Sequence, residues 1–238
     1  MEKLVSIIMP HYNNKMDVMK AIMSVKQQIY KNWELIIIDD CSTDGSYEYI
    51  ENYLDEYPDN KIILKRQDKN RGCYICMNEG ILISNGELIT RLDSDDKLHP
   101  EKLLLQVNYL NQNQNMVAVN CIYERSKVFK RKGEATLMFK KNIIEQIGYY
   151  DSVRFGADTE FRERLEKVFK NKVGMINKTL YFALNRKNSL TNSKKTGNGL
   201  IRDKYKNNYQ KWHNSSKILY IEYPLLNRPF SVDSIMLS

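Results

Sequence analysis

Short apolar runs alternate with amphipathic runs through the first half of this chain, and this alternation constrains the fold more than any other feature. The apolar runs are rich in Ile, Leu and Val, which is typical of strands buried on both faces. A β-α-β-α order of this kind predicts an α/β fold, with a mostly parallel sheet flanked by helices. The predicted strands are Leu4–Met9, Glu34–Ile38, Lys61–Lys65, Glu87–Leu92 and Met116–Tyr123. The predicted helices between them are Met16–Gln28, a helix carrying Tyr47, Ile50 and Leu54, Cys73–Ser84, and Glu101–Leu110.

Polar residues follow three of the predicted strands. They are Pro10–Asn13, Asp39–Asp40 and Asp93–Asp96. Because the carboxyl ends of parallel strands meet at one edge of a sheet, these three segments are expected to lie together. Ligands bind at that edge in open α/β sheets, so the sequence predicts a site there.

The third of these segments is the most acidic, with carboxylates at Asp93, Asp95 and Asp96. Like charges this close raise one another's pKa, so a protein usually keeps them where a positive charge offsets them. Mg²⁺ and Mn²⁺ prefer carboxylate oxygens and leave positions open for phosphate. Asp93 and Asp95 would point to the same side of an extended segment. The alternative is that one of these residues caps the helix that begins near Pro100.

The alternation weakens after Arg125, but the composition shifts little, which favours one continuous domain. Residues 185–199 are rich in Asn, Ser, Lys and Gly, which predicts a mobile loop. The other elements predicted here are helices at Phe139–Ile147, Asp158–Phe169 and Arg202–His213, paired strands at Gly174–Leu184, and an irregular tail at Tyr220–Ser238.

The 238-residue chain has the composition of an ordinary globular protein, with 42% hydrophobic and 28% charged residues. It has no apolar run long enough to span a bilayer and no signal peptide after Met1, which predicts a soluble, cytoplasmic protein. The net charge of +8 suits phosphorylated partners and allows peripheral contact with an anionic membrane surface. The basic residues are scattered and no nucleic-acid-binding motif accompanies them, so no nucleic-acid partner is predicted.

Two of the four cysteines, Cys73 and Cys76, have C-x-x-C spacing. A structural zinc site would need a second pair of ligands at such spacing, and the chain has none. We therefore expect reduced thiols on the turn and the inner face of a helix.

These motifs together resemble those of the family 2 inverting glycosyltransferases, which have the GT-A fold. The order and spacing of the motifs through the first 96 residues make the resemblance specific. The matching segments are Val5–Asn13, Leu35–Gly45, Asn70-Arg71-Gly72, and Gly86–Ile89 leading into Leu92–Asp96. Looser matches are Gly148–Asp151, Gly156–Asp158 and Asn188–Thr191.

The resemblance implies a Rossmann-like GT-A sheet with a smaller acceptor-side region at its C-terminal end. Residues 1–124 would form the half that binds the nucleotide sugar. Residues 125–238 would form the acceptor-side half, including the mobile loop and the tail. The donor is expected to be a nucleotide sugar, with a UDP-sugar favoured, and the cofactor would be Mn²⁺ or Mg²⁺.

The resemblance also assigns roles to individual residues on the donor side. Pro10, Tyr12 and Asp40 would hold the nucleotide base, with the Tyr12 ring on its face and Asp40 accepting a hydrogen bond from it. Arg71 would line the same site.

The resemblance assigns the remaining residues to metal binding and to the transfer reaction itself. Asp93 and Ser94 would lie against the ribose or the metal, and Asp95 would ligate the metal that bridges the diphosphate. Asp158 would be the base that takes a proton from the acceptor hydroxyl as that oxygen attacks the anomeric carbon, which gives inversion.

Three of these positions, and Asp39 beside Asp40, also have structural interpretations. Tyr12 could pack on the core, and Asp39 could be a turn residue and not a ligand. Arg71 could pair with a surface acid, and Asp158 could be the N-cap of its helix.

The chain departs from the family pattern at one place. The family commonly has Glu-Asp where this chain has Ala157-Asp158, so the neighbouring acid is lost or replaced by Glu160, which becomes the next candidate for the base. A late histidine completes the metal shell in some GT-A enzymes, and His213 could do so here.

The sequence therefore predicts a metal-dependent inverting glycosyltransferase, of the hexosyltransferase type, that acts on a hydroxyl of a glycan, lipid-linked or protein-linked acceptor. A nucleotidyltransferase that forms sugar nucleotides is one alternative, but it would need a glycine-rich loop after the first strand, and Pro10–Asn14 has no glycine. A non-catalytic binding module is the other, and it would have no need of the acidic run and Asp158.

Overall fold

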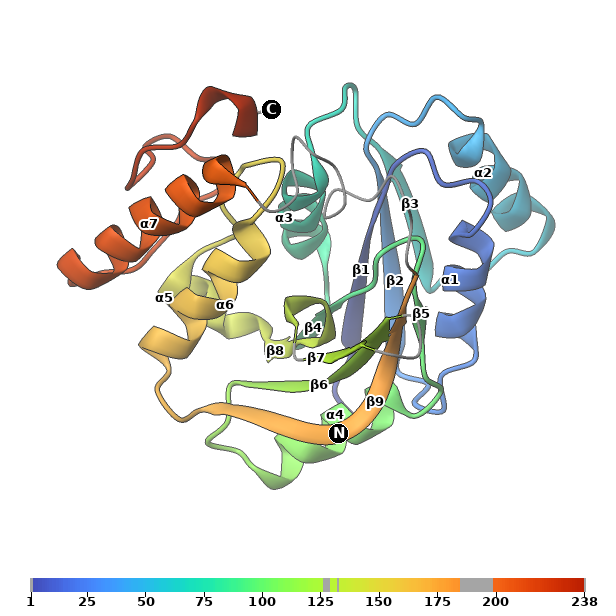
Figure 1. Ribbon diagram of the computed structural model, residues 1–238. Helices are drawn as coiled ribbons and strands as arrows, with labels where there is room; N and C mark the ends of the chain where they lie inside the picture. Colours follow the sequence, from blue (N-terminus) through green and yellow to red (C-terminus); the bar gives the residue numbers. More distant parts are fainter. Residues whose placement is uncertain (1, 126–128, 132, 185–198, 238) are drawn as a thin grey trace.

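The computed structural model describes residues 2–125, 129–131, 133–184 and 199–237. Within these residues nine strands form one sheet in the order β3-β2-β1-β4-β8-β6-β9-β5, with β7 pairing with β6 (Figure 1). The strands are β1 (Val5–His11), β2 (Trp33–Asp39), β3 (Ile62–Arg66), β4 (Leu88–Arg91), β5 (Lys97–Leu98), β6 (Ala118–Arg125), β7 (Phe129–Arg131), β8 (Met138–Lys140) and β9 (Val173–Ala183). The helices are α1 (Val18–Lys26), α2 (Ser46–Glu56), α3 (Cys73–Ile83), α4 (Lys102–Gln112), α5 (Ile144–Ile147), α6 (Ala157–Val168) and α7 (Leu200–Ser215).

The predicted α/β class is confirmed, and the first half of the sheet follows the prediction closely. Strands β3, β2, β1 and β4 are parallel neighbours, while the antiparallel pairings elsewhere are only two or three residues long. The loops that follow β1 and β2 gather at the upper edge of the sheet in Figure 1, and the N-terminus lies at the lower edge. The predicted loop at 185–199, with the Asn188–Thr191 motif inside it, lies outside the described residues apart from Gly199.

Helices cover both faces of the sheet because successive side chains of each buried strand point to opposite sides. Ile7 and Met9 of β1 pack in a core that includes side chains of α1, α2 and α4. Ile8 packs in a second core with side chains of α3, α5, α6 and α7. This double burial explains why the strands read as continuous apolar runs in the sequence.

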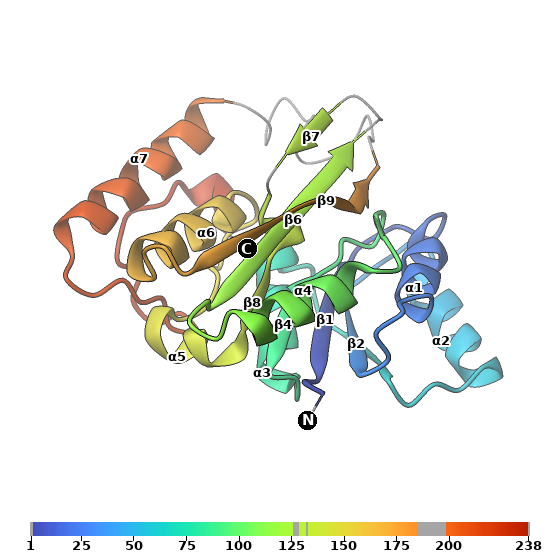
Figure 2. The same cartoon turned by 90° about the horizontal axis from the view of Figure 1, so that it is seen from below.

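Two predicted elements of the second half were wrong. The segment from Phe139 to Ile147 is not one helix, because Phe139 lies in β8, which is inserted antiparallel between β4 and β6, and α5 begins only at Ile144. The segment from Gly174 to Leu184 is not a pair of strands but the single long strand β9, which is parallel to β6 (Figure 2). Gly174 marks no turn: an added Cβ there would lie 2.2 Å from the Tyr109 ring, so glycine permits close packing against α4.

The tail after α7 is irregular, as predicted, but it is bonded to the body of the protein. The Tyr149 and Arg154 amides donate to the carbonyl oxygens of Ile221 and Met236, both at 2.8 Å. The Arg228 guanidinium donates to the buried Asp151 carboxylate, which the Tyr205 hydroxyl also contacts at 3.0 Å. Burial raises the pKa of Asp151 to about 6, although the positive charge of Arg228 acts to lower it.

A buried ion pair anchors α6. Glu160 and Arg164 are both fully buried, and the guanidinium donates to both Glu160 oxygens at 2.9 Å. Arg164 also donates to the carbonyl oxygens of Ile147 and Tyr149, and the His213 ring of α7 lies 3.0 Å from Glu160 Oε1. These contacts fix α6 against α5 and α7 at once.

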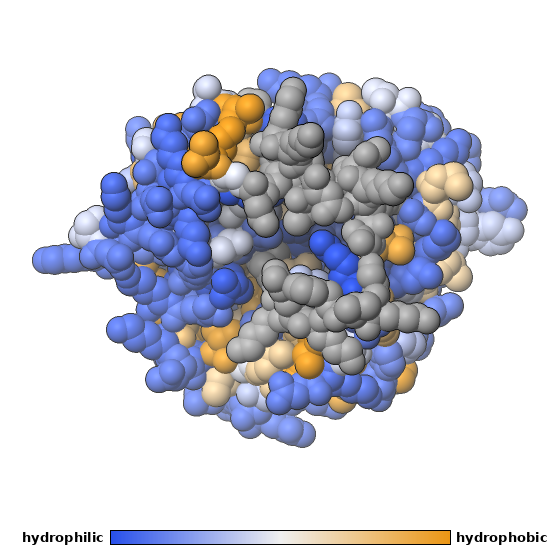
Figure 3. Space-filling view, viewed as in Figure 1, coloured by the Kyte–Doolittle hydropathy of each residue, from blue (hydrophilic) through white to orange (hydrophobic). Residues whose placement is uncertain are grey.

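The surface carries little concentrated apolar area on the face seen in Figure 3, where hydrophobic residues lie in small separate patches. Among the described residues, no helix combines the length and the apolar character needed to cross a bilayer.

The anchor of α6 gives a direct stability prediction. Arg164→Ala removes the charged partner of the buried Glu160 carboxylate and one donor from each of two carbonyl groups, and we expect a loss of about 3–5 kcal/mol in the free energy of unfolding. Arg162→Ala is the matched control, because Arg162 pairs with Glu166 on the exposed side of the same helix at the same spacing. That pair should contribute only about 0.3–0.5 kcal/mol. Urea titrations followed by circular dichroism measure both values, and equal losses would contradict the assignment of Arg164 as an anchor.

Candidate functional site

The three polar segments that follow β1, β2 and β4 meet at one edge of the sheet, as predicted. The Asp40 amide donates to the His11 carbonyl at 2.8 Å, which joins the ends of β2 and β1. The Asn14 side-chain amide donates to the Ser94 carbonyl at 2.7 Å, which joins the loop after β1 to the acidic run after β4. The edge is therefore held together by specific bonds between loops as well as by the strand register.

Asp39 is a turn residue, as its structural interpretation proposed. Its carboxylate is fully buried and accepts the Ser42 amide at 2.9 Å. His11 Nε2 lies 3.9 Å from the other oxygen and 2.8 Å from the Ser46 hydroxyl. Burial lowers the pKa of His11, although the charges of Asp39 and Asp44 act to raise it.

Asp40 holds the loop that precedes α3. Its carboxylate is nearly buried, and its two oxygens accept the Arg71 amide at 2.7 Å and the Gly72 amide at 2.8 Å. Gly72 has a φ of 94°, a backbone conformation that favours glycine, and it caps α3. Each carboxylate oxygen retains a second lone pair, so these bonds leave Asp40 able to accept from a ligand as well.

The same loop is supported from the second half of the chain. The Arg154 guanidinium donates to the Asn70 side-chain oxygen at 2.8 Å and to its carbonyl at 3.2 Å. The Arg71 guanidinium lies 3.8 Å from Glu79, which also accepts the Tyr223 hydroxyl. Arg71 therefore does pair with an acid, as its structural interpretation proposed, but it does so at the rim of the site.

The two predicted residues at the end of β1 differ in exposure. Pro10 is buried within the strand, whereas 47% of Tyr12 is exposed just beyond it. The Tyr12 ring is therefore not a core side chain, and it is available to a flat apolar group at this edge.

The acidic run divides into two half-exposed and two buried residues. Asp93 and Asp95 are half-buried, whereas Ser94 and Asp96 are buried. Asp93 Oδ1 accepts a hydrogen bond from Arg91 Nε at 2.6 Å. The cap interpretation of this run was wrong, because β5 follows it directly and Glu101 is the N-cap of α4.

Negative charge is concentrated in this run. Burial, together with the charges of Asp93 and Asp95, raises the pKa of Asp96 to about 8. The described residues include no group of three or more His, Cys, Asp or Glu placed to hold a metal ion. Mg²⁺ is commonly held by one or two carboxylates with the remaining positions taken by water and substrate phosphates. Asp93 and Asp95 are hard oxygen donors in a region of excess negative charge, so they fit such a cation.

Asp158 lies in the first turn of α6, after Gly156, which is the N-cap. Asp158 is therefore not the N-cap, although its Oδ1 accepts the Thr159 amide at 2.8 Å. Among the described residues both hydrogen bonds to this carboxylate use Oδ1, which leaves Oδ2 for an incoming hydroxyl.

The Cys73 thiol shows that Asp158 belongs to the same region as the strand-end acids. Burial raises the pKa of this thiol to about 12, and the charges of Arg91, Asp93, Asp158 and Asp40 all act on it. Cys73 begins α3 and Cys76 faces the core one turn later, as predicted for these two residues. The predicted base, the acidic run and Asp40 therefore all contribute to the electrostatic environment of one thiol at the start of α3.

Glu160 and His213 do not belong to this group. Glu160 is fully buried in its ion pair with Arg164, which removes it as an alternative base. The His213 ring is 5% exposed and is bonded to Glu160, so within the described part of the chain it does not share a metal site with Asp93 and Asp95.

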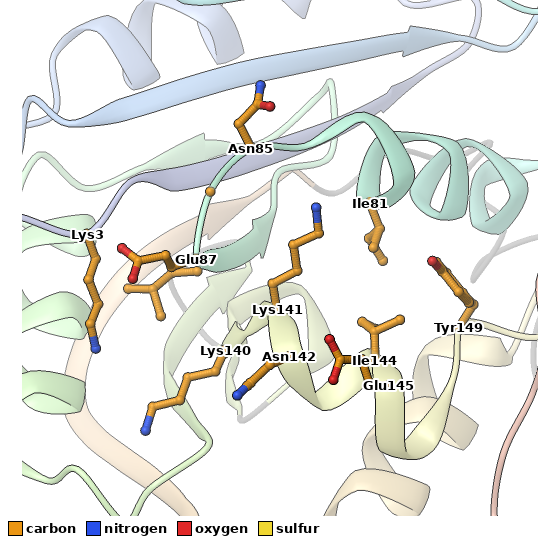
Figure 4. A pocket seen from close by; sticks show the side chains of 12 residues that line it. Lys3, Ile81, Asn85, Glu87, Lys140, Lys141, Asn142, Ile144, Glu145 and Tyr149 are labelled. Carbon is orange, nitrogen blue, oxygen red and sulfur yellow. The ribbon is translucent and has the colours of Figure 1, made fainter.

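A cavity of about 640 Å³ lies away from this site, at the edge where β1 and β4 begin (Figure 4). Its lining contains no residue that the sequence predicted for the site. Burial and the charge of Lys3 lower the pKa of Lys140 in its wall. The lining residues are Lys3, Ile81, Asn85, Gly86, Glu87, Leu88, Lys140, Lys141, Asn142, Ile144, Glu145 and Tyr149.

Sequence reasoning missed several residues that hold the site in place. Asn14 follows the predicted Pro10–Asn13 segment by one position, and its polar character was the only signal. Arg154 and Tyr181 lie more than 80 residues from the groups they contact, so no local pattern could have identified them.

Comparison with known proteins identifies the relatives of this chain. A family model described as Glycosyl transferase family 2 matches residues 6–189. The glucosyltransferase WfgD of Escherichia coli, named as a UDP-Glc:alpha-D-GlcNAc-diphosphoundecaprenol beta-1,3-glucosyltransferase, is 36% identical over 110 residues. That match covers 46% of this chain and 42% of WfgD. The matched stretch spans less than half the length of the curated relatives of this chain.

Two solved structures share the fold. S. aureus TarS 1-349 in complex with UDP-GlcNAc has a TM-score of 0.68 at 18% identity, over 79% of this chain and 60% of that one. The mannosyltransferase PcManGT from Pyrobaculum calidifontis, in complex with GDP-Man and Mn2+, has a TM-score of 0.67 at 19% identity, over 78% of this chain and 58% of that one. These likenesses confirm the predicted GT-A fold.

Asp40 holds the loop before α3 through the Arg71 and Gly72 amides, and we call this the clamped loop. This role of Asp40 is testable without any ligand. Asp40→Ala removes charge-assisted acceptors that contribute about 1.5–3 kcal/mol each, so the Arg71 and Gly72 amides should exchange about 10- to 100-fold faster. Asp40→Asn keeps one acceptor oxygen and should protect one of the two amides. Native-state hydrogen exchange by NMR measures both effects.

Asp44→Ala is the control, because the hydrogen bonds that Asp44 makes to described residues are with Lys15 and Ser46 in the neighbouring turn and not with the Arg71 and Gly72 amides. Unchanged exchange of Arg71 and Gly72 in Asp40→Ala would show that the loop is held by other contacts.

Proposed function

The chain belongs to glycosyltransferase family 2, and from this premise we propose that it transfers a sugar from a UDP-sugar to a hydroxyl of an acceptor, with inversion at the anomeric carbon. The observation that carries the proposal is the meeting of the segments after β1, β2 and β4 at one edge of the sheet, where the Asp40 amide is bonded to His11 and the Asn14 side chain to Ser94. Nucleotide-holding loops, a metal-binding run and a base are the three parts that such a transfer needs.

The donor is proposed to bind across the ends of β1, β2 and β4. The exposed Tyr12 ring would stack on the base, beside Pro10, and the loop clamped by Asp40 would present Arg71 to the nucleotide. UDP is favoured over GDP by the names of the relatives, because WfgD is named for UDP-Glc and the TarS structure contains UDP-GlcNAc. The PcManGT complex with GDP-Man makes GDP the competitor to test.

Asp95 and Asp93, with Ser94 between them, would hold Mn²⁺ or Mg²⁺ against the diphosphate. A divalent cation bound there would offset the negative charge that builds on the departing nucleoside diphosphate. Arg91 keeps the Asp93 carboxylate oriented through its 2.6 Å hydrogen bond. The PcManGT structure is a complex with Mn2+, which supports the use of a divalent cation by a protein of the same fold.

Asp158 would act as the base. Its Oδ2 would accept the proton of the acceptor hydroxyl, the acceptor oxygen would form the new bond to the anomeric carbon, and the bond to the diphosphate oxygen would break with its electron pair leaving on the diphosphate. A single displacement of this kind inverts the anomeric configuration.

We propose a division of labour within one continuous domain. Residues 1–124 would hold the donor, and residues 125–238 would supply the base and the acceptor-side surface. The acceptor is proposed to be a glycan or a lipid-linked or protein-linked sugar in the cytoplasm, and the name of WfgD favours a lipid-linked diphosphate.

The first experiment is a donor screen. UDP-, GDP- and TDP-sugars are incubated with the protein and Mn²⁺ or Mg²⁺, and release of the nucleoside diphosphate is measured with and without EDTA. We expect turnover with a UDP-sugar, loss of turnover in EDTA, and recovery when Mn²⁺ is restored in excess. Full turnover in exhaustive chelator would refute the metal dependence, and no turnover with any donor would count against the proposed activity.

The base is tested by Asp158→Asn, which keeps the shape and the hydrogen bond to the Thr159 amide but removes the proton acceptor. We expect normal folding and UDP affinity, with turnover lowered by about 10²–10⁴-fold. Thr159→Ala is a control on the same helical turn, and it should retain most turnover. Near-normal turnover by Asp158→Asn would move the base elsewhere.

A further inference from the structure

The hydroxyl of Tyr181 joins the two ends of the acidic run. Tyr181 lies in β9 and is fully buried. Its oxygen accepts the Asp93 amide at 3.1 Å, and its proton is donated to Asp96 Oδ2 at 2.9 Å. One buried hydroxyl therefore fixes both the backbone at the start of the run and the carboxylate at its end.

The strand that carries Tyr181 supports the run at further points. β5 follows the run directly and pairs with β9, with Leu98 opposite Tyr181. The Leu184 amide, just past the end of β9, donates to Asp96 Oδ1 at 2.8 Å. The Asn14 bond to the Ser94 carbonyl holds the run from its other side. Asp95 thus lies on a short loop whose neighbours on both sides are fixed.

The orientation of the Asp96 carboxylate separates it from the two other carboxylates of the run. Both of its oxygens accept donors from β9 and the residues after it, so this carboxylate faces that strand. Asp93 and Asp95 are left as the half-exposed carboxylates of the run. Without the Tyr181 hydroxyl, the buried Asp96 Oδ2 would lose a donor and the Asp93 amide would lose an acceptor. Both losses favour rearrangement of the loop.

We propose that Tyr181 is a positioning residue for the divalent cation of the donor site, acting through the Asp93 backbone and the Asp96 carboxylate. This inference rests on the proposed function. Groups that orient metal ligands without touching the metal typically change metal affinity by about 10–100-fold when removed. A hydroxyl that only stabilised the fold would change the free energy of unfolding and leave the affinity for metal unaltered.

The test is Tyr181→Phe, which keeps the ring in the core and removes only the hydroxyl. The dissociation constant of Mn²⁺ is measured by electron paramagnetic resonance in saturating UDP, and that of UDP by calorimetry in EDTA. We expect Mn²⁺ to bind about 10–100-fold more weakly, with metal-free UDP affinity within about twofold of wild type. Asp95→Ala provides the reference for loss of a direct ligand.

Tyr30→Phe is the matched control. Tyr30 is also a buried tyrosine, and its hydroxyl donates to the Lys3 carbonyl at 2.6 Å at the opposite edge of the sheet. Tyr181→Phe loses two hydrogen bonds and Tyr30→Phe loses one, so thermal unfolding should report destabilisation of both variants while only Tyr181→Phe changes Mn²⁺ affinity.

Three outcomes would overturn the role proposed for Tyr181. Wild-type Mn²⁺ affinity in Tyr181→Phe would overturn the role of Tyr181 while leaving the proposed function standing. Unfolding of Tyr181→Phe but not of Tyr30→Phe would assign the hydroxyl to global stability and also overturn the inference. Wild-type protein that binds neither UDP nor Mn²⁺ would refute the proposed function and the inference with it.

Discussion

The organisation of this protein depends on one electrostatic constraint, which is that a buried carboxylate needs hydrogen-bond donors. Several acids stand close together where the parallel strands end, and the three most buried accept hydrogen bonds that shape the site. Asp39 takes the Ser42 amide and closes the turn after β2, and Asp40 takes two amides of the loop before α3. Asp96 takes Tyr181 and Leu184 and attaches the acidic run to β9. The loops of the site are thus positioned by the charges that the site contains.

The same constraint couples the two halves of the chain. The loop at Asn70 is held by Arg154 and the acidic run by Tyr181, so residues from the second half of the chain fix loops of the first half. The sheet is continuous across the boundary, because β8 lies between β4 and β6. This arrangement argues that the first half of the chain would not keep its geometry if it were separated from residues after 125.

The parts of this structure that depend on contacts between residues close together in the chain could be predicted from the sequence. The parts that depend on contacts between distant residues could not. The strand register of β1, β2 and β4 follows from local apolar periodicity, and with it the meeting of Tyr12, Asp40 and Asp93 at one edge. The short strand β8 and the long strand β9 could not be assigned correctly, because their pairing is decided by partners distant in sequence. Tyr181 carries no local signal, since a tyrosine in a strand reads as an ordinary core residue. The long-range donors were therefore the part of the site that only the structure could supply.

The departure at Ala157 is explained by the packing of α6. The family commonly has an acid at this position, but here the side chain is fully buried in the core that α6 shares with α3 and α7, where a carboxylate would be costly. The next acid on this side of α6 is Glu160, about one helical turn after Ala157. Its carboxylate is bonded to Arg164 and His213 inside the protein. The second carboxylate has thus become part of the anchor of the helix and not part of the site. Among the described residues Asp158 Oδ2 accepts no hydrogen bond, and the orientation of Asp158 depends on how firmly that anchor holds α6.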